Sequence, residues 1–559
     1  MLFVASMGTA LPAIAASQDD IARLLGDYHR TSDSSTLESG TSVPRPEQLL
    51  ESCPHLAQLR TTDISTALAA LYQHQDYAPL WNEPHRRDAL HAELARLVDD
   101  GLYLADYPFS QQISGDLDVC AELRVSSEYL LALEHLSSGR FDQQALEPMW
   151  RREKTATQAS ATSRWMHEGL TDINAAFDKA RPDLGLYLDL RKAYVRLRDE
   201  RPEYEEVAEG ELIRPGEQDP RVPQLAARLR AEGYLAEPET AEVKLDSSSE
   251  APVDSGDSLP ENDQSGVQAS NILNPRLEAA LKQFQEDHGL KADGVLGPNT
   301  LTALNQPLSD QLDIARINLE RLRWVNAMLE DEVLLVNDAR NLLRHYQQGD
   351  LVWRTQVITG RPGRETPLLV SRLNRITLNP DWTVPPTIRK EDMIPAIRED
   401  LGYLERKNLI VIDYQGNRLD PQSINWYDPR GIMLRQPPGP DNPLGQVVFR
   451  FDNPYAVYLH DTPNRHLFSR AQRNLSSGCV RVEGADVLAD TLFSRMDASK
   501  RARVERQRAS RSTHQVAVED GPQVILGYWT AEADANGRLL LSQDPYGKDP
   551  ALLRAFANR

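Results

Sequence analysis

Cysteine is scarce in this chain, and its scarcity limits what the protein can be. The 559 residues contain three cysteines, Cys53, Cys120 and Cys479. Three cannot all pair within one molecule, so at least one is free or bonded to something else. A disulfide-dense scaffold and a multi-cysteine zinc site are therefore disfavoured. For Cys53 and Cys120, pairing in an oxidising compartment and two separate thiols are both open.

Long hydrophobic runs and positive charge are also in short supply. No internal stretch reaches the roughly 18 apolar residues of a membrane-spanning helix, which excludes a multi-span membrane protein. The chain has 62 Lys and Arg against 83 Asp and Glu, a net charge of −21. Nucleic-acid binding needs clustered positive charge, so no nucleic-acid partner is expected.

The first residues carry the compartment signal. Residues 2–16 are apolar or small and uncharged, and Ala13-Ile14-Ala15 has the small-x-small form of a signal-peptidase site. We therefore expect a signal peptide over 1–16 and export. The usual basic segment is missing, which a start upstream of Met1 would explain; a buried N-terminal helix is the alternative.

Patterning along the chain predicts a multidomain α+β protein. Ile64, Leu68, Leu71 and Tyr72 repeat at helical spacing, and few β-branched runs follow, so we expect a mostly helical scaffold domain over 45–210. A small helical unit is expected over 219–306. It is split by an acidic loop at 237–271, since residues 237–263 hold nine acidic side chains and one lysine and cannot bury a core.

Short β-rich segments separated by Gly, Pro and Asn begin near residue 330. We predict a β-rich domain over 330–535 with an insert at 386–430, and a C-terminal extension over 536–559. Alternation of Tyr455, Val457 and Leu459 predicts a strand that ends near His460.

Cys479 and His460 are the residues in this region best suited to catalysis. They lie 19 positions apart, a separation that a loop between neighbouring strands can close. An imidazole can take the thiol proton and later return it to a leaving amine. Gly478 removes side-chain bulk beside the thiol, so the backbone N–H groups at 478–479 could face an oxyanion. An inert buried cysteine with a structural histidine is the alternative.

The residues around this pair resemble a known family. His460-Asp-Thr-Pro463 followed by Ser476-Ser-Gly-Cys-Val-Arg481 is similar to the signature of the L,D-transpeptidases, whose common form is His-Gly-Thr followed by Ser-His-Gly-Cys-x-Arg. Asp461 and Ser477, in place of Gly and His, resemble the large multidomain Gram-negative branch. Leu378–Pro386, Gln436–Gly445 and Tyr528-Trp529-Thr530 also fit that branch. Residues 276–305 look like a peptidoglycan-binding repeat, and Tyr72–Trp81 looks like the scaffold region.

The resemblance implies roles for individual residues. Cys479 would be the nucleophile and His460 the general acid/base, with the backbone carbonyl of Asp461 orienting the imidazole. Arg481 and Ser477 would contact substrate, although a structural role for Arg481 is an open alternative. Tyr458 and Trp426 would line the cleft unless they pack in the core. No cofactor and no metal site are expected.

The implied reaction cleaves the meso-diaminopimelate–D-Ala bond of a peptidoglycan tetrapeptide stem through a thioester and crosslinks two diaminopimelate residues. Its partners would be donor and acceptor stems, with carbapenems as inhibitors; cell-wall synthesis proteins are further partners that the resemblance leaves open. The location would be the periplasm of a Gram-negative bacterium. The alternatives are L,D-carboxypeptidase activity or D-amino-acid exchange with the same nucleophile, and a peptidoglycan-binding scaffold without activity.

Overall fold

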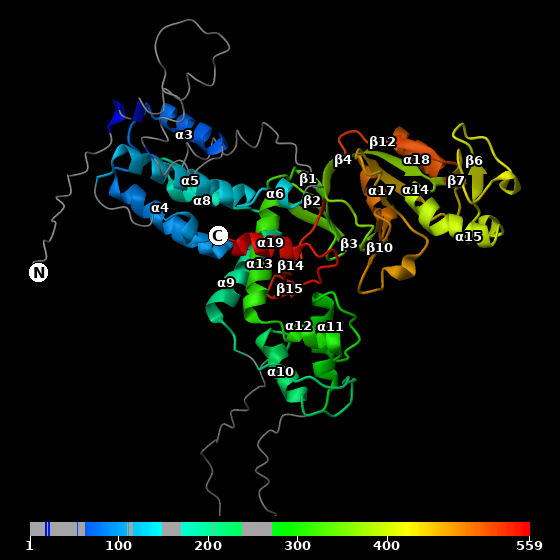
Figure 1. Cartoon of the computed structure of the whole chain (residues 1–559), viewed down its shortest axis with the longest axis horizontal. Coiled ribbons are helices and arrows are strands. Elements are labelled where there is room, and N and C mark those ends of the chain that lie inside the picture. Colours follow the sequence, from blue (N-terminus) through cyan, green and yellow to red (C-terminus); the bar gives the residue numbers. More distant parts are fainter. Residues whose placement is uncertain are drawn as a thin grey trace, which may run out of the picture.

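The computed structural model describes residues 17–19, 21–22, 53, 62–108, 110, 116–147, 169–203, 205–236 and 271–558. The predicted signal peptide and nearly all of the predicted acidic loop lie outside these ranges. Figure 1 shows helices at the N-terminal side, a small helical unit below, and a strand-rich region to the right. The predicted fold class, multidomain α+β with a β-rich C-terminal domain, is confirmed. No described helix is long and apolar enough to cross a bilayer.

The N-terminal region is helical, as its periodicity predicts. Its principal helices are α3 (Thr62–His74), α4 (Pro84–Arg96), α5 (Val119–Ser138) and α8 (Ile173–Ala180), with short turns η2 (Leu97–Asp100), η3 (Leu104–Asp106) and α6 (Gln143–Leu146). Leu68, Leu71 and Tyr72 are buried in one core. Gly101 ends η2 with φ of 74°. Cys53 and Cys120 form a disulfide, which decides between the two open readings.

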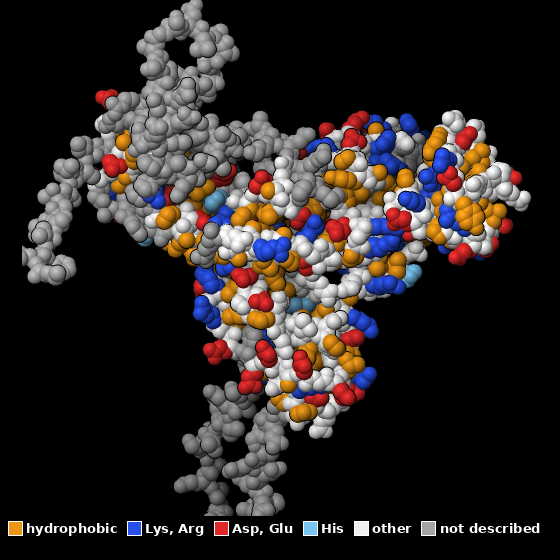
Figure 2. All heavy atoms as spheres, viewed as in Figure 1, with side chains coloured by type: hydrophobic (Ala, Val, Ile, Leu, Met, Phe, Trp, Pro, Cys, Tyr) orange, Lys and Arg blue, Asp and Glu red, His pale blue; other side chains and the backbone are white. Residues whose placement is uncertain are grey.

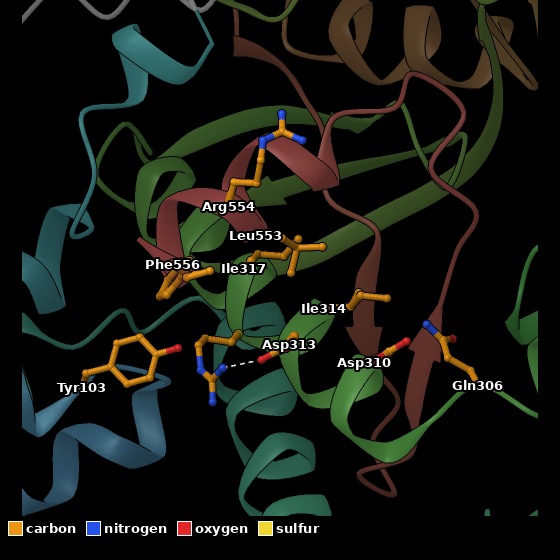
Figure 3. A pocket seen from close by; sticks show the side chains of 11 residues that line it. Tyr103, Gln306, Asp310, Asp313, Ile314, Ile317, Leu553, Arg554 and Phe556 are labelled. Atoms are coloured by element: carbon orange, nitrogen blue, oxygen red, sulfur yellow. Dashed lines mark hydrogen bonds and ion pairs between the residues drawn. The ribbon is translucent and has the colours of Figure 1, made fainter. Parts of the chain in front are cut away.

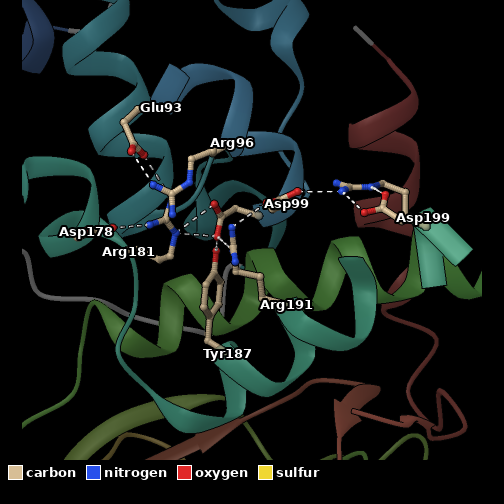
Figure 4. Close-up of polar contacts among 10 residues, drawn as sticks. Glu93, Arg96, Asp99, Asp178, Arg181, Tyr187, Arg191 and Asp199 are labelled. Atoms are coloured by element: carbon tan, nitrogen blue, oxygen red, sulfur yellow. Dashed lines mark hydrogen bonds and ion pairs between the residues drawn. The ribbon is translucent and has the colours of Figure 1, made fainter. Parts of the chain in front are cut away.

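A buried ionic network joins this region to the next helix, α9 (Gly185–Glu200). Figure 4 shows arginines converging on two carboxylates at the end of η2. The fully buried Asp100 accepts hydrogen bonds from Arg181 (3.2 Å), Arg191 (2.7 Å) and the Tyr187 hydroxyl (2.9 Å). A buried carboxylate needs such partners, since removing them leaves an uncompensated charge. The network therefore holds the N-terminal helices against α9.

The small helical unit comprises α10 (Val222–Ala231), α11 (Pro275–Asp287) and α12 (Pro298–Leu304). α12 begins with Pro298 in its first turn, a position that suits proline because the N–H it lacks would have no partner within the helix. The buried Gln285 side chain donates to the Val295 carbonyl (2.9 Å) and accepts from the Gly294 N–H (2.8 Å). These bonds fix the turn between α11 and α12.

A central helix, α13 (Leu308–Asn326), connects the small unit with the strand-rich region. It packs in one core with α9, the early strands and the C-terminal helix α19 (Asp549–Ala557). Within that core, the Asn318 amide and the Thr530 hydroxyl are hydrogen-bonded at 2.9 Å. Between the sheet and α19, the chain adds a hairpin of β14 (Ala531–Ala533) and β15 (Leu539–Leu541).

Ten strands form the main sheet of the C-terminal region. They are β1 (Glu332–Asn337), β2 (Leu342–Gln347), β3 (Asp350–Gly360), β4 (Leu369–Leu378), β8 (Val447–Phe451), β9 (Leu459–His460), β10 (Asn474–Ser476), β11 (Val480–Val482), β12 (His514–Ala517) and β13 (Gln523–Gly527). Their order is β10-β3-β11-β9-β8-β4-β13-β1-β2, with β12 on β4. Because β2 also pairs with β3, the path closes on itself. Buried side chains of α17 (Ala485–Ser494) and Val504 of α18 (Ala498–Ala509) complete a core with these strands.

The strand predicted over 455–459 is wrong except at its end, because only Leu459 and His460 pair as β9. The side chain of Asn453 takes up the backbone groups before it. Its Oδ1 accepts from the N–H groups of Tyr455 (3.1 Å) and Val457 (3.0 Å), and its Nδ2 donates to the Val457 carbonyl (2.8 Å). An asparagine bonding its own neighbouring backbone competes with a sheet ladder.

An insert lies between β4 and β8, and its residues have a core of their own. It contains β5 (Trp382–Thr383), α14 (Pro386–Ile388), η4 (Arg389–Met393), α15 (Ile394–Glu399), α16 (Tyr403–Arg406), β6 (Ile410–Ile412), η5 (Pro421–Ser423) and β7 (Met433–Gln436). The three strands pair in the order β5-β7-β6. Figure 2 shows basic side chains gathered near α18, beside this part of the surface.

Candidate active site

Strand register brings the predicted catalytic residues onto one face of the sheet. β9 pairs in parallel with β11, with Arg481 opposite His460, and antiparallel with β8, with Val448 opposite His460. Continued by one residue, the register of β9 and β11 sets Cys479 opposite Tyr458. In keeping with this, the Val480 N–H donates to the Tyr458 carbonyl at 3.1 Å. Residues opposite one another share a face, as do residues two apart on one strand. Cys479, Tyr458, His460 and Arg481 therefore lie on the same face.

The imidazole of His460 is buried and oriented by the backbone. Its Nδ1 lies 2.6 Å from the carbonyl oxygen of Asp461. A carbonyl can only accept, so Nδ1 carries the hydrogen and the neutral ring has its lone pair on Nε2. Burial, and then the charge of Arg481, lower the pKa of His460 to about 3. The imidazole is therefore neutral at physiological pH.

Tyr458 is the immediate polar neighbour of the Cys479 thiol. The thiol is half-buried, and burial raises its pKa. Two polar groups of Tyr458, its backbone N–H and its hydroxyl, act against burial and lower the pKa of the thiol. The Ala456 carbonyl lies 4.0 Å from Sγ. Within the described ranges, the thiol makes no hydrogen bond to His460. The resting pair is thus a neutral thiol beside a neutral imidazole.

The Arg481 side chain is positioned to act on both groups. Its Nε is buried and, within the part of the chain that the structure describes, has no hydrogen-bond partner. Its positive charge lowers the pKa of both His460 and Cys479. No side-chain hydrogen bond ties Arg481 to the cysteine loop within that part, which leaves its donors available to an anionic ligand.

The turn before Cys479 is held by Ser476. The Gly478 N–H donates to Ser476 Oγ (3.1 Å), which itself donates to the Cys479 carbonyl (2.6 Å). Gly478 has φ of 114°, a left-handed conformation that favours glycine. Because the N–H of Gly478 is engaged, the prediction of an oxyanion site here rests on the N–H of Cys479.

Arg364 contacts Ser477, and no pattern in the sequence predicts it as a site residue. Arg364, in the loop after β3, donates to Ser477 Oγ (3.1 Å) and forms a two-pronged ion pair with Asp392 of the insert (2.7 and 2.8 Å). Its second terminal nitrogen also contacts Glu391. Arg364 lies 113 residues from Ser477 in the chain, and no motif marks it.

Comparison with known proteins identifies the domain in which these residues lie. Residues 331–504 match the family model described as "L,D-transpeptidase catalytic domain". This range includes Cys479, Tyr458, His460 and Arg481. The chain contains an L,D-transpeptidase catalytic domain. Residues 262–304 match the model "Putative peptidoglycan binding domain", and residues 66–193 match a model described as a scaffold domain.

One relative and two solved structures are similar to parts of this chain. The chain is 34% identical over 317 residues to a protein of Haemophilus influenzae named "Putative L,D-transpeptidase"; the match covers 52% of this chain and 64% of that protein. An L,D-transpeptidase from Mycobacterium smegmatis aligns at 14% identity over 35% of this chain and 58% of its own, with a TM-score of 0.16. One from Xylanimonas cellulosilytica aligns at 14% identity over 57% and 98%, with a TM-score of 0.15. At these scores neither alignment supports a structural argument.

Trp426 is not brought together with the other predicted site residues of the transpeptidase domain. It is buried in the core of the insert, and its Nε1 donates to the Pro421 carbonyl at 2.9 Å. The structure therefore places it in packing rather than beside Cys479.

A cavity of about 490 Å³ lies away from the Cys479 face, between α13, α19 and Tyr103 (Figure 3). Ile314, Ile317 and Leu553 form an apolar part of its wall, and Arg316 is ion-paired with Asp313 at its edge. None of its lining residues belongs to the cysteine and histidine arrangement.

Proposed function

We propose that the protein is a cysteine-dependent L,D-transpeptidase that acts on peptidoglycan tetrapeptide stems. The observation that carries the proposal is the half-buried thiol of Cys479 beside Tyr458 and His460 on one face of the matched domain. The thiolate attacks the carbonyl carbon between the L-centre of meso-diaminopimelate and the terminal D-Ala. The C–N bond breaks, D-Ala leaves with a proton on its amine, and a thioester remains. An amine of a neighbouring diaminopimelate then attacks the thioester, forms an amide and releases the thiolate.

His460 serves as the acid and base in this scheme. Its hydrogen-bonded Nδ1 directs the lone pair of Nε2 away from Asp461, so Nε2 is the atom that takes the thiol proton and returns one to D-Ala. The low pKa of His460 keeps this atom unprotonated at neutral pH. Because the resting thiol lies 4.0 Å from the Ala456 carbonyl and makes no hydrogen bond to His460 within the described ranges, a change of thiol rotamer or a bridging water completes the transfer.

Two other groups stabilise negative charge, one on the reacting carbonyl oxygen and one on a carboxylate of the substrate. The Cys479 N–H is the donor assigned to the developing oxyanion, a contact worth about 3 kcal/mol in hydrolases. The unpaired donors of Arg481 suit a stem carboxylate, since a guanidinium binds carboxylates with two parallel hydrogen bonds. Residues 262–304 would hold the polymer, in keeping with the model that they match.

We also propose that the protein is exported to the periplasm. Disulfides persist in oxidising compartments, and the Cys53–Cys120 bond supports such a location. The uncharged residues 2–16 with Ala13-Ile14-Ala15 support cleavage near Ala16. Cell fractionation with N-terminal sequencing of the mature protein tests this: an uncleaved protein in the cytoplasmic fraction would contradict it.

The activity test is product analysis with purified protein and defined stems. Donor tetrapeptide plus acceptor should give a diaminopimelate–diaminopimelate crosslink with wild type and none with Cys479→Ala. Crosslinks formed by Cys479→Ala would contradict the proposal. Release of D-Ala without a crosslink would assign carboxypeptidase activity, and incorporation of an added D-amino acid would assign exchange. Undiminished binding to sacculi with no Cys479-dependent product would assign a scaffold.

Carbapenems give an independent test of the nucleophile. Thiolate addition to the lactam carbonyl breaks the ring C–N bond, the ring nitrogen takes a proton, and the whole drug stays attached as a thioester. Intact-mass spectrometry should show one adduct per chain, mapped to Cys479. An adduct that persists in Cys479→Ala would contradict the assignment.

A further inference from the structure

Arg450 completes a row of side chains that ends at the candidate nucleophile. It lies on β8, and the pairing of Val448 with His460 and Phe449 with Leu459 sets Arg450 opposite Tyr458. Tyr458 in turn stands opposite Cys479 in the register of β9 and β11. Arg450, Tyr458 and Cys479 thus follow one another across three neighbouring strands on the same face. None of the motifs singled out in the sequence includes Arg450.

The contacts along this row are specific. The guanidinium carbon of Arg450 lies 5.0 Å from the centre of the Tyr458 ring, and Arg450 Nε donates to Thr377 Oγ1 at 3.0 Å. Thr377 is buried on β4. The guanidinium is therefore anchored from one side while it stacks on the ring at the other. Such cation–π contacts are attractive, and they strengthen when the cation and the ring are desolvated.

Tyr458 lies between Arg450 and the sulfur of Cys479. Tyr458 stands opposite Cys479 in the strand register, its hydroxyl lowers the pKa of the thiol, and its ring meets the imidazole of His460 edge to face at 5.8 Å between centroids. A ring that tilted or rotated would change the position of the hydroxyl relative to sulfur. Arg450 is the side chain that fixes the ring from β8.

The thiol needs this support because its surroundings oppose ionisation. Burial raises the pKa of Cys479. The charged and titratable groups that act against burial are Tyr458 before β9, Arg481 on β11 and Arg450 on β8. The loop after β3 presents the charged Arg364, which donates to Ser477 Oγ at 3.1 Å, and the uncharged Thr366, whose hydroxyl donates to the Gly478 carbonyl at 2.9 Å.

We propose that Arg450 is a positioning residue for Cys479: its guanidinium holds the Tyr458 ring so that the hydroxyl donates to Sγ and stabilises the thiolate. The proposal rests on the proposed function only in that it takes Cys479 as the nucleophile. The ionisation of the thiol can be measured without any peptidoglycan substrate, so the two proposals can fail separately.

The experiment measures the rate at which iodoacetamide alkylates Cys479, followed by intact-mass spectrometry over a range of pH. This rate follows the fraction of the thiol that is ionised. The other two cysteines form the disulfide, so native protein has one reactive thiol. The variants are Arg450→Met, which keeps bulk without charge, Arg450→Lys, Tyr458→Phe and the double variant of Arg450→Met with Tyr458→Phe. Arg375→Met is the matched control, because exposed Arg375 lies opposite Arg450 on β4 but contacts Gln515 instead.

We expect Arg450→Met to slow alkylation at neutral pH by roughly three- to tenfold and to approach the wild-type rate at high pH, where the thiol is fully ionised. Arg450→Lys should fall between the two, and Arg375→Met should match wild type. Because Arg450 acts through Tyr458, the loss in the double variant should be smaller than the product of the single losses. Circular dichroism and melting curves confirm that each variant is folded.

Three results would overturn the proposal. One is an Arg450→Met profile that coincides with wild type, and another is a loss that is equal at every pH, which would show altered access instead. The third is a double variant whose loss equals the product of the single losses, which would make Arg450 a charge acting independently of Tyr458. If alkylation behaves as expected while no crosslink or thioester forms from stems, the positioning role stands and the proposed function fails.

Discussion

Arg364 donates a hydrogen bond to Ser477 Oγ at 3.1 Å and at the same time pairs with Asp392 of the insert. One side chain thus ties the residue two positions before Cys479 to a segment that is otherwise folded around its own core. The Arg364 side chain is 13% exposed and that of Asp392 is 41% exposed, so solvent screens the ion pair only in part.

Arg364→Met should loosen the insert against the cysteine loop. Single exposed ion pairs contribute about 0.2–1 kcal/mol, and Arg364 makes several contacts, so we expect amide exchange in residues 389–399 to accelerate roughly three- to tenfold. Hydrogen–deuterium exchange with mass spectrometry measures this. Arg406→Met is the control, because Arg406 pairs with Asp400 inside the insert. Equal exchange in both variants would contradict a specific role for Arg364.

His460 and Asp461 should respond differently to substitution. His460→Gln should slow carbapenem acylation by about 10²–10⁴, the usual contribution of a positioned acid/base group. Asp461→Asn should stay within about tenfold of wild type, because the oxygen bonded to Nδ1 belongs to the backbone. Asn also keeps an acceptor for the Gln446 N–H, which bonds the Asp461 carboxylate at 2.9 Å. Stopped-flow measurement of the carbapenem acylation rates tests both expectations. A loss of rate in Asp461→Asn equal to that in His460→Gln would refute the assignment of the backbone carbonyl as the group that orients His460.

Asp338 should make the folded protein sensitive to rising pH. Both of its carboxylate oxygens are buried and lack a partner within the described ranges, and burial holds its pKa well above the usual value. The folded state then binds more protons than the unfolded state above pH ~4, so this carboxyl costs stability as pH rises from there towards its folded pKa.

Asp338→Asn removes that ionisation. Its melting temperature should exceed that of wild type by a margin that grows with pH, equivalent to at most about 1.4 kcal/mol per pH unit across the window. Thermal melts of both proteins between pH 4 and pH 8 measure the margin. A margin that shrinks as pH rises would contradict an elevated pKa.

The Cys53–Cys120 disulfide should stabilise the helical region without affecting chemistry. It closes a loop of 67 residues. The loop-entropy model assigns such a crosslink about 4 kcal/mol. The double variant Cys53→Ser with Cys120→Ser should unfold at a lower temperature, whereas Cys479→Ser should keep the wild-type melting temperature and form no adduct with carbapenem. No change in melting on loss of both cysteines would show that the crosslink does not constrain the unfolded chain.

Local patterns were sufficient for the helices and for a candidate nucleophile. The spacing of Leu68, Leu71 and Tyr72 predicts α3, and Pro298 after a glycine predicts the start of α12. Helical periodicity and capping act within a few residues, so the sequence alone carries them. The Cys479 and His460 motifs are equally local, and they led to the domain that the family comparison matches.

The strand over 455–459 could not be predicted, because the decisive event is a side chain of Asn453 bonding the backbone in place of a neighbouring strand. The two alternatives for Trp426 could not be decided from the sequence for a similar reason. An aromatic side chain suits a cleft and a core equally well, and only the packing of the insert places it in a core.

By itself, the sequence determined the helical periodicity, the change to short strands after residue 330, and the chemistry available at Cys479 and His460. Only the tertiary structure decided which groups surround the thiol. Arg450, Tyr458 and Cys479 meet because the pairing of β8, β9 and β11 sets them opposite one another. Arg364 reaches Ser477 across 113 residues because the loop after β3 folds back beside the cysteine turn. Such long-range contacts depend on strand register and chain topology, and no local spacing of residues encodes either one.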